Sequence, residues 1–335
     1  MLLDVKHYFN NFVNSINLNL IKILIKDWKN IKVLVVGSNG LVGSSVSRIL
    51  SRSHKVTDLI KSTRDTTDLF SLDATKKLIQ STSPDLIVMS AAKVGGILAN
   101  NNFRTEFILE NLKINMNIFE SCIGNENIKI INLGSSCIYP LNSQNPIKEE
   151  YFMTGILEPT NSPYAMAKIA AIEMGDALEK QYGNSILNLM PTNLYGPNDK
   201  FSENESHVIP GLILRMHKAK VENEKNFLIW GTGKPLREFL YVDDLAYAID
   251  FLLDKNWNSK ILNIGSGVEI SIKDLAYLIK KIVGYKGKIS FDNSKPDGNP
   301  RKLLDSTKIH SLGWRAITSL EDGLTSTYNW FKKNY

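Results

Sequence analysis

The stretch Lys32-Val33-Leu34-Val35-Val36-Gly37-Ser38-Asn39-Gly40-Leu41-Val42-Gly43 decides the fold of this 335-residue chain. Its first five residues predict a buried strand, and a helical pattern continues from the glycines to Leu50. The spacing G-x-x-G-x-x-G between strand and helix lets the backbone turn tightly and approach a pyrophosphate, whose charge a helix N-terminus favours. The stretch therefore predicts a dinucleotide site at residues 37–43. The alternative is a plain tight turn.

The end of the next predicted strand, Val56–Ser62, indicates which dinucleotide binds. An NAD enzyme usually has a carboxylate at such a strand end, where it binds the ribose 2′-hydroxyl. Here the chain offers Arg64, with Lys61 nearby. A guanidinium suits a 2′-phosphate, so Arg64 favours NADP(H). The alternative is that Asp65 binds the ribose and Arg64 is a surface charge.

Two later strands end in residues suited to a site. The predicted strand Asp85–Ala92 ends in Ala91 and Ala92, whose small side chains let the backbone lie against a cofactor. A buried strand over Ile128–Ile131 leads into Leu133-Gly134-Ser135-Ser136-Cys137-Ile138-Tyr139-Pro140. Ligands of open α/β sheets lie beyond the carboxyl ends of the strands, so these hydroxyls and the thiol are candidate site residues.

Tyr164 and Lys168 form a third signal. Their spacing of four places them on one face of a helix expected over Pro163–Tyr182. An adjacent ammonium favours phenolate, and this makes the phenol a better acid toward a carbonyl oxygen that gains a hydride. Downstream of a dinucleotide turn and a serine-bearing strand end, the pair predicts carbonyl reduction. The alternative is an incidental helix pair.

Several blocks resemble the GDP-L-fucose synthases of the extended short-chain dehydrogenase/reductase family. They cover the chain from about Val33 to the C-terminus and include Ala91-Ala-Lys-Val-Gly-Gly96, Leu133–Pro140, Glu158-Pro-Thr-Asn-Ser-Pro-Tyr-Ala165, Met190-Pro-Thr-Asn-Leu-Tyr-Gly-Pro197, Ser206-His-Val-Ile-Pro210, Trp230-Gly-Thr-Gly233, Arg237-Glu-Phe-Leu240 and Lys295-Pro-Asp-Gly298. The resemblance implies an α/β fold, with a Rossmann doubly wound parallel sheet and a smaller C-terminal α/β substrate lobe. It implies three parts: an N-terminal extension (1–30), an NADP-binding domain (31–195) and a mainly sugar-nucleotide-binding lobe (196–335), from which segments around 229–260 return to the Rossmann side.

The resemblance also implies a reaction: 3,5-epimerisation and NADPH-dependent 4-reduction of GDP-4-keto-6-deoxy-D-mannose. Cys137 would be the base and His207 its acid partner, since a thiol and an imidazole can move protons near neutral pH. Tyr164 and Ser135 would serve the C4 oxygen, and Lys168 would hold the nicotinamide ribose and tune Tyr164. Alternatives are a C4-reductase of another GDP-4-keto-6-deoxy sugar such as a heptose, an NAD-retaining 4-epimerase and a non-catalytic NADP-binding protein.

Further binding residues follow from the same resemblance. The cofactor residues beyond the glycine turn would be Leu133, Gly134, Ser135, Ser136, Tyr164, Lys168, Pro191, Thr192, Asn193, Leu194 and His207. The substrate would bind Arg215, Trp230, Arg237 and Asp297, although Arg215 could be a surface charge and Trp230 a core aromatic. Asn39 stands where some relatives carry a basic residue, so the preference for NADP rests more heavily on Arg64.

Helical patterns are expected over Phe103–Cys122, Val208–Ala219, Arg237–Phe251, Ile272–Val283 and Leu320–Lys333, with strands over Phe227–Trp230 and Ile289–Asp292. Asp243 and Asp244 are expected to cap the Arg237–Phe251 helix. Cys122 lies on an apolar helix stripe and is expected to be structural. The resemblance implies a homodimer through the helices Phe103–Cys122 and Pro163–Tyr182.

The composition limits the class of protein. Hydrophobic residues make up 43% and charged residues 22%, the net charge is +6, and Lys and Arg are scattered, which gives little support to a nucleic-acid partner. No apolar run approaches the roughly 18 residues of a membrane span. Two cysteines and five dispersed histidines indicate neither a disulfide framework nor a metal site, so a cytoplasmic location is the default.

Residues 1–30 have loosely helical apolar spacing, and Lys22 and Lys26 interrupt the best apolar run, unlike a signal peptide. We expect a helical arm packed on the main domain or on a partner subunit. The alternatives are an interfacial membrane helix and a start codon placed too far upstream.

Overall fold

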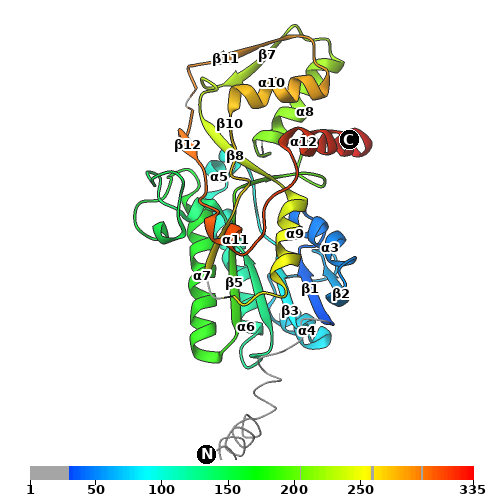
Figure 1. Ribbon diagram of the computed structural model, residues 1–335, viewed down its shortest axis with the longest axis vertical. Coiled ribbons are helices and arrows are strands. Elements are labelled where there is room, and N and C mark those ends of the chain that lie inside the picture. The colour runs from blue at the N-terminus through cyan, green and yellow to red at the C-terminus, as the bar shows by residue number, and fades with distance from the viewer. Residues whose placement is uncertain (1–29, 204, 258–259, 296) are drawn as a thin grey trace, which may run out of the picture.

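The computed structural model describes residues 30–335 except 204, 258–259 and 296 (Figure 1). The expected N-terminal extension therefore lies, apart from Asn30, outside the described residues. The larger part of the molecule is a six-stranded sheet in the order β2-β1-β3-β4-β5-β9, and all its neighbouring strands are parallel. Its strands are β1 (Ile31–Val36), β2 (Val56–Ser62), β3 (Leu86–Met89), β4 (Lys129–Leu133), β5 (Ser185–Pro191) and β9 (Ile261–Ile264).

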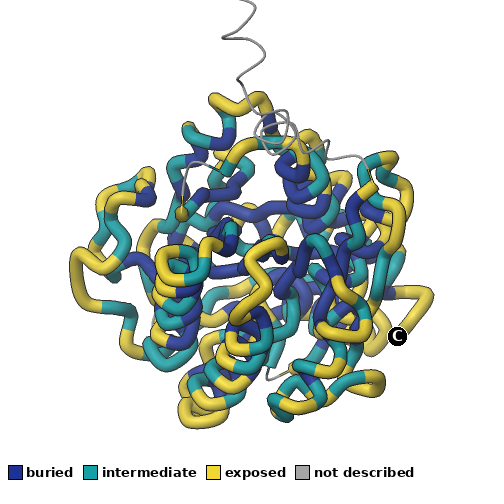
Figure 2. The backbone as a smooth tube through the Cα atoms, turned by 90° about the horizontal axis from the view of Figure 1, so that it is seen from below, coloured by how far each residue is buried: buried dark blue, intermediate teal, exposed yellow. Residues whose placement is uncertain are grey.

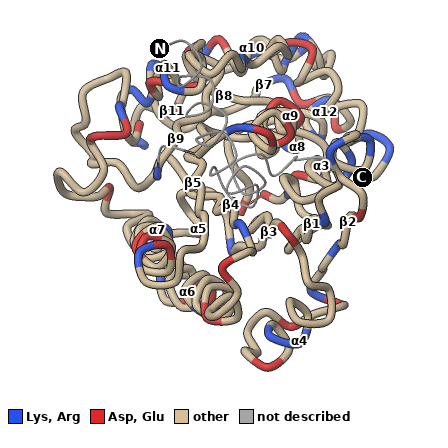
Figure 3. The backbone as a smooth tube through the Cα atoms, turned by 60° about the horizontal axis from the view of Figure 1, so that its bottom comes forward, with Lys and Arg blue, Asp and Glu red and all other residues tan. Residues whose placement is uncertain are grey.

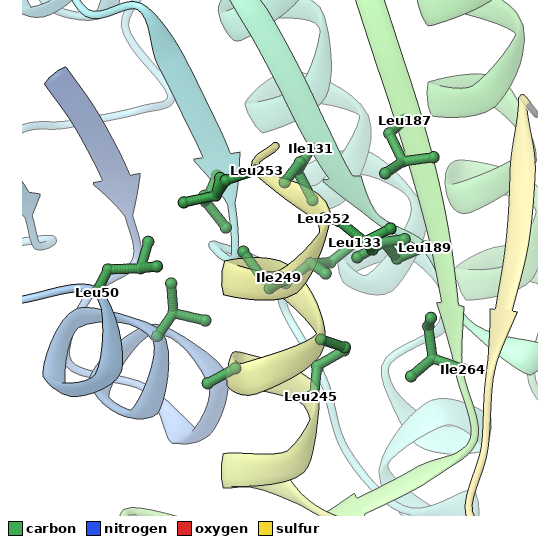
Figure 4. Close-up of a cluster of buried hydrophobic side chains, with 14 of the residues drawn as sticks. Leu50, Ile131, Leu133, Leu187, Leu189, Leu245, Ile249, Leu252, Leu253 and Ile264 are labelled. Carbon is green, nitrogen blue, oxygen red and sulfur yellow. The ribbon is translucent and has the colours of Figure 1, made fainter. Parts of the chain in front are cut away.

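Helices cover both faces of this sheet because its strands are apolar on both faces. Val33 and Val35 of β1 pack in one cluster with α3 (Leu41–Leu50) and α9 (Val242–Leu252). Figure 4 shows this cluster, with Leu50 of α3 and Leu245 and Ile249 of α9. Leu34 and Val36 of the same strand belong to a second cluster with α4 (Leu72–Thr82), α6 (Arg104–Ser121) and α7 (Ser162–Tyr182). Figure 2 shows the buried residues running through the centre of the molecule. The expected doubly wound parallel sheet is confirmed.

A smaller α/β part lies beyond the carboxyl ends of the strands (Figure 1). At its centre, β8 (Leu236–Tyr241) pairs with β6 (Asn193–Tyr195), β10 (Glu269–Ser271) and β12 (Arg301–Lys302). A separate pair is formed by β7 (Asn226–Trp230) and β11 (Lys288–Asp292). Residues of α8 (Val208–Val221), α10 (Ile272–Val283) and α12 (Leu320–Asn334) pack with these strands in a third apolar cluster.

Short elements complete the described chain. They are the helices α5 (Ile97–Asn102) and α11 (Thr307–Ser311) and the 3-10 turns η1 (Ser136–Ile138) and η2 (Glu149–Tyr151). After Tyr195 the chain packs on the main sheet again through α9 (Val242–Leu252) and β9 (Ile261–Ile264). This segment begins later than residue 229, the start that the sequence suggests. The residues before it belong to the smaller part, where β7 pairs with β11 and β8 is the central strand of the sheet.

The helix expected over Arg237–Phe251 is wrong in its first part. Leu236–Tyr241 is strand β8, and the helix begins only at Val242. The run Phe239–Val242 is buried and apolar, and a short apolar run fits a strand and a buried helix equally well. Asp243 and Asp244 consequently lie in the first turn of α9, and the residue at its N-cap is Tyr241, which makes no side-chain cap.

Two surface properties bear on the class of protein. Figure 3 shows basic and acidic residues interspersed over α4, α6 and α7. Among the described residues, none of the helices is both long enough and apolar enough to cross a bilayer.

Candidate active site

The glycine turn connects β1 to α3 and lies against the residues that follow β3. Gly37 has a φ of 79°, and a Cβ on it would lie 2.6 Å from the backbone nitrogen of Ala91. A Cβ on Gly43 would lie 2.1 Å from the carbonyl oxygen of Gly37. No side chain caps the N-terminus of α3, which begins after Gly40. Bare backbone therefore lines this strand edge, and α3 presents its N-terminus there, as binding of a pyrophosphate requires.

The residues that would choose between NAD and NADP lie at the neighbouring strand end. The carbonyl oxygen of Ser62, at the end of β2, accepts hydrogen bonds from the backbone of Gly37 (2.9 Å) and from the Ser38 hydroxyl (3.1 Å). Arg64 and Asp65 follow two and three residues later, and both are exposed. Both are near enough in the chain to reach a ribose at this edge.

The residues expected to carry out the reduction come from two elements that meet. Ser135 directly follows β4 and caps η1, where its hydroxyl accepts a hydrogen bond from the Cys137 backbone at 3.2 Å. The same hydroxyl hydrogen-bonds Tyr164 from the first turn of α7. Burial and the negative charge of a Cys137 thiolate raise the pKa of Tyr164, and the Ser135 hydrogen bond acts in the opposite direction. Ser135, Cys137 and Tyr164 therefore share one site.

Lys168 lies one turn along α7 from Tyr164. Its ammonium donates to the carbonyl oxygen of Leu133 at 2.7 Å and is 5.8 Å from the centre of the Tyr164 ring. Burial lowers the pKa of Lys168 to about 8. The sequence predicts that Lys168 makes the phenol of Tyr164 more acidic. In the structure the pKa of Tyr164 is raised, because its burial outweighs the hydrogen bond from Ser135 that favours phenolate.

Cys137 has a basic neighbour that the sequence analysis missed. Its sulfur lies 3.7 Å from the ammonium of Lys302 and 3.5 Å from the amide nitrogen of Asn161. Lys302 is far away in the chain but belongs to β12, which pairs with β8. A positive charge at this distance stabilises a thiolate. The signal in the sequence was Arg301–Lys302, close behind the Lys295–Gly298 block, but no local pattern connects it with Cys137.

Backbone contacts of the two residues that follow Lys302 hold it in place. The backbone nitrogen of Leu303 donates to Asn145 at 2.7 Å, and that of Leu304 donates to the buried carboxylate of Glu238 at 3.1 Å. The carbonyl oxygen of Leu303 accepts from Ile147 at 2.7 Å. The loop after η1 and strand β8 thus fix the strand that carries the ammonium.

His207 stands at the N-cap of α8. The residue is exposed, yet the surrounding protein lowers the pKa of its imidazole by desolvation. The two observations agree if the ring lies in a cleft, with protein on most sides and water entering from one. Arg215 and Arg237 show the same combination, since both are partly exposed while burial lowers the pKa of each guanidinium.

The expected substrate residues gather in the smaller part of the molecule. The Asp297 carboxylate accepts hydrogen bonds from the backbone nitrogen (2.6 Å) and hydroxyl (2.7 Å) of Thr232, two residues beyond β7. Its charge also acts on Arg237. Trp230, at the end of β7, is 61% exposed and is therefore not a core aromatic. The Arg215 guanidinium lies over the ring of Phe227 at 5.1 Å.

The residues Pro191–Leu194 connect the two parts. Pro191 ends β5 in the main sheet, and Asn193 begins β6 in the smaller one. The hydroxyl of Thr192 and the amide of Asn193 both donate to the carbonyl oxygen of Glu238, at 3.2 and 2.8 Å. This segment passes from one part to the other, where a molecule bound between them would lie.

Other features of the described residues lie apart from these side chains. They contain no cluster of three or more His, Cys, Asp or Glu that could hold a metal ion. A shallow cavity of about 470 Å³ lies against α12 and contains none of the candidate site residues; it is lined by Pro197, Asp322, Thr325, Ser326, Asn329, Trp330 and Lys333.

Comparisons with known proteins agree with this geometry. Residues 33–265 match the model of the NAD dependent epimerase/dehydratase family. GDP-L-fucose synthase 1 of Arabidopsis thaliana is 47% identical over 306 residues, which cover 91% of this chain and 94% of the relative.

Solved structures give a similar result. A GDP-L-fucose synthetase from Naegleria fowleri bound to NADP superposes with a TM-score of 0.82 at 30% identity, over 92% of this chain and 95% of that one. A GDP-mannoheptose C4 reductase from Campylobacter jejuni with NADP bound has a TM-score of 0.80 at 34% identity, over 90% and 98% of the two chains.

Proposed function

Because this chain belongs to the NAD dependent epimerase/dehydratase family, in the branch that contains the GDP-L-fucose synthases, we propose that it converts GDP-4-keto-6-deoxy-D-mannose to GDP-L-fucose with NADPH. The observation that carries the proposal is the meeting of Ser135 and Cys137 with Tyr164 beyond the end of β4. The first two steps would be epimerisations at C3 and C5, and the third a reduction at C4.

The cofactor would lie along the edge formed by the glycine turn, Ala91 and Ala92, and residues 133–136. The close approach of Gly37 to Ala91 supports this placement, because a side chain on Gly37 would collide with the Ala91 backbone and push the turn away from the end of β3. NADPH, when bound, supplies the hydride for the C4 carbon. Arg64 would bind its 2′-phosphate, and the Lys168 ammonium would hold the nicotinamide ribose while it stays anchored to Leu133.

In the reduction, Tyr164 would give its phenolic proton to the C4 oxygen as the hydride reaches the carbon. Burial raises the pKa of Tyr164, so the phenol carries its proton at neutral pH and gives it up only when the C4 oxygen gains negative charge from the hydride. The Ser135 hydroxyl would hydrogen-bond the same oxygen and stabilise the charge that develops on it.

In the epimerisations, Cys137 would remove the proton on carbon, and the C4 ketone would take up the charge as an enolate. Lys302 and Asn161 support the thiolate that this step requires, at 3.7 and 3.5 Å from the sulfur. His207 would return a proton to the opposite face. The lowered pKa of His207 makes its protonated form a stronger acid than free imidazolium.

The nucleotide-sugar would bind through the smaller part of the molecule. Arg215 and Arg237 would pair with the diphosphate, and partial burial strengthens such pairs. Trp230 offers an exposed ring for stacking, and Asp297 presents a carboxylate beside Arg237. We accordingly assign 31–195 mainly to the cofactor and 196–335 mainly to the sugar nucleotide, with 242–264 packed on the main sheet.

We propose a homodimer through α6 and α7. These helices pack on each other, and their outer surface exposes Leu109 (48%), Met116 (51%) and Met166 (48%). Apolar residues in such a row favour contact with a second copy. The variant Met116→Arg should shift the mass measured by light scattering from dimer to monomer. We further propose a cytoplasmic location, where NADPH and nucleotide-sugars would be at hand.

The deciding experiment is incubation with GDP-4-keto-6-deoxy-mannose and NADPH in D2O. We expect one NADPH consumed per product and deuterium at both C3 and C5. The variant Cys137→Ala should bind NADPH normally and lose the exchange, whereas the control Cys122→Ala, at a buried structural thiol, should keep it. Reduction without exchange would favour the alternative, a C4-reductase of another GDP-4-keto-6-deoxy sugar. The similarity to the GDP-mannoheptose C4 reductase structure supports this alternative.

The cofactor assignment has its own test. Arg64→Ala should weaken binding of NADPH far more than binding of NADH, measured by titration of the intrinsic fluorescence. Equal effects on the two cofactors would contradict the role given to Arg64 and would favour Asp65 as the residue that meets the ribose.

A further inference from the structure

Among the described residues, none of the side chains hydrogen-bonds the imidazole of His207, and the residue stands at the N-cap of α8 without a side-chain cap. The position of the ring therefore depends on where the backbone before α8 is held. This backbone is Glu205 and Ser206.

Two glycines in the loop between β3 and α5, Gly95 and Gly96, hold that backbone. The Gly96 nitrogen donates to the carbonyl oxygen of Glu205 at 2.9 Å. A Cβ on Gly96 would lie 2.3 Å from the carbonyl oxygen of Ser206, and one on Gly95 would lie 3.3 Å from that of Glu205. The loop after β3 thus lies directly against the two residues that precede His207, with no room for a side chain at Gly96.

The glycine pair is itself held by a buried side chain. The amide nitrogen of Asn100 donates to the carbonyl oxygens of Gly95 and Gly96, at 2.7 and 3.1 Å. Asn100 lies on α5 and is 6% exposed. Its own amide oxygen is buried without a partner, which costs free energy that the two donated bonds must offset. A second asparagine, Asn111 of α6, binds the backbone nitrogen and oxygen of Lys93, both at 3.0 Å.

The described residues just before His207 also bond to one another. The Ser206 hydroxyl donates to the carbonyl oxygen of Lys200 and accepts from the backbone of Ser202, both at 2.6 Å. Lys200 also pairs with Glu205. These bonds fold residues 200–206 on themselves, and the contact with Gly96 sets where the folded segment lies.

We propose that Gly96 and Asn100 are positioning residues for proton transfer, because together they seat the backbone that carries the imidazole of His207. This inference rests on the proposed function, in which His207 returns a proton to the substrate. Neither residue touches substrate or cofactor in this assignment. Both act through the backbone of Glu205 and Ser206.

The test compares Gly96→Ala with a matched control, Gly211→Ala. A Cβ on Gly211 would meet the Ser206 Cβ at 3.6 Å, an ordinary contact, and the residue lies inside α8. Deuterium exchange into GDP-4-keto-6-deoxy-mannose is followed with NADP+ in place of NADPH, so that the hydride step is silent. We expect Gly96→Ala to slow exchange by at least about tenfold, since a displacement of about 1 Å costs far more than that in related steps. Gly211→Ala should match the parent.

Two further readouts separate positioning from general damage. Reduction of the pre-epimerised 4-keto sugar and the dissociation constant of NADPH should change by less than about threefold in Gly96→Ala, because they depend on the strand ends of the main sheet. The pH profile of exchange should shift in Gly96→Ala and not in the control. Exchange at the parent rate, or equal losses in exchange, reduction and NADPH binding, would overturn the proposal.

A milder variant covers the case in which Gly96→Ala does not fold. Asn100→Ala removes the two donated bonds together with the unpartnered oxygen, and it should slow exchange while leaving NADPH binding intact. Parent-like exchange in Asn100→Ala would overturn the proposal.

If the parent enzyme itself exchanges no deuterium, the proposed function fails. The effect of Gly96 on the position of His207 is then tested directly. The imidazole resonance assigned through His207→Asn should then shift and titrate differently in Gly96→Ala. An unchanged His207 resonance in Gly96→Ala would refute the claim that Gly96 positions His207.

Discussion

The buried ammonium of Lys168 should make the stability of the protein depend on pH in a way that one substitution removes. The residue is 4% exposed, and burial lowers its pKa from 10.5 to about 8. The difference corresponds to about 3 kcal/mol of cost for carrying the charge in the folded state. Lys168→Met removes this cost together with the hydrogen bond to Leu133, so the difference in stability between parent and variant at neutral pH is the baseline for the pH dependence.

The sign of the pH dependence follows from where the proton leaves. Below the folded pKa of about 8, Lys168 is protonated in both states and contributes no slope. Between about 8 and 10.5, the unfolded chain keeps a proton that the folded chain has lost. The free energy of unfolding of the parent should therefore rise with pH in this window, by about 3 kcal/mol relative to Lys168→Met.

Urea unfolding followed by tryptophan fluorescence, at intervals between about pH 7 and about pH 10, measures this difference. The control is Lys180→Met, on the same helix, whose side chain is 70% exposed. The parent-minus-variant difference should climb for Lys168→Met and stay level for Lys180→Met. A level difference for both variants would refute the reasoning, because it would mean that the Lys168 ammonium keeps its ordinary pKa in the folded protein.

Three further expectations concern the site and the core. In Gly43→Ala, the added Cβ would meet the carbonyl oxygen of Gly37 at 2.1 Å, so the dissociation constant of NADPH should rise at least about tenfold by calorimetry; an unchanged constant would contradict the placement of the turn. Lys302→Met should slow deuterium exchange at C3 and C5 with NADPH binding unchanged, and Lys302→Arg should recover part of the rate; parent-like exchange in Lys302→Met would exclude a role for the charge beside Cys137. A thiol reagent at about pH 8 should modify Cys137 in the native protein and Cys122 only after unfolding, because burial raises the pKa of Cys122 to about 12. Rapid modification of both cysteines in the native protein would contradict this expectation.

Local patterns were sufficient for the elements of the main sheet. The β-branched run before Gly37 and the glycine spacing after it predict strand, turn and helix, and the structure has β1 and α3 at these residues. Cys122 is fully buried in the cluster beneath α6, as its place on an apolar stripe indicates. These features depend on neighbours in the chain, which a sequence pattern records directly.

Long-range contacts set the limit of such reasoning. Leu236–Tyr241 became a strand because three other strands pair with it, and none of these pairings leaves a local trace. The contact of Lys302 with Cys137 could not be predicted for the same reason, since the two residues are 165 positions apart in the chain. The raised pKa of Tyr164 could not be predicted either, because the pKa of a phenol depends on its burial, which spacing on a helix does not reveal.

The sheet order β2-β1-β3-β4-β5-β9 also bears on how the chain matures as it leaves the ribosome. Strands β1 to β5 have all been synthesised once Pro191 is made, but the outer edge of β5 gains its partner only with Ile261–Ile264. Until then the nascent sheet has an open edge, a template for mispairing with another chain. Lys302 emerges later still, and Glu238 holds its strand only once Leu304 has arrived. A ribosome-bound chain would thus acquire a nucleotide-binding surface well before it could move a proton, and a product truncated between these points would sequester cofactor without turning over substrate.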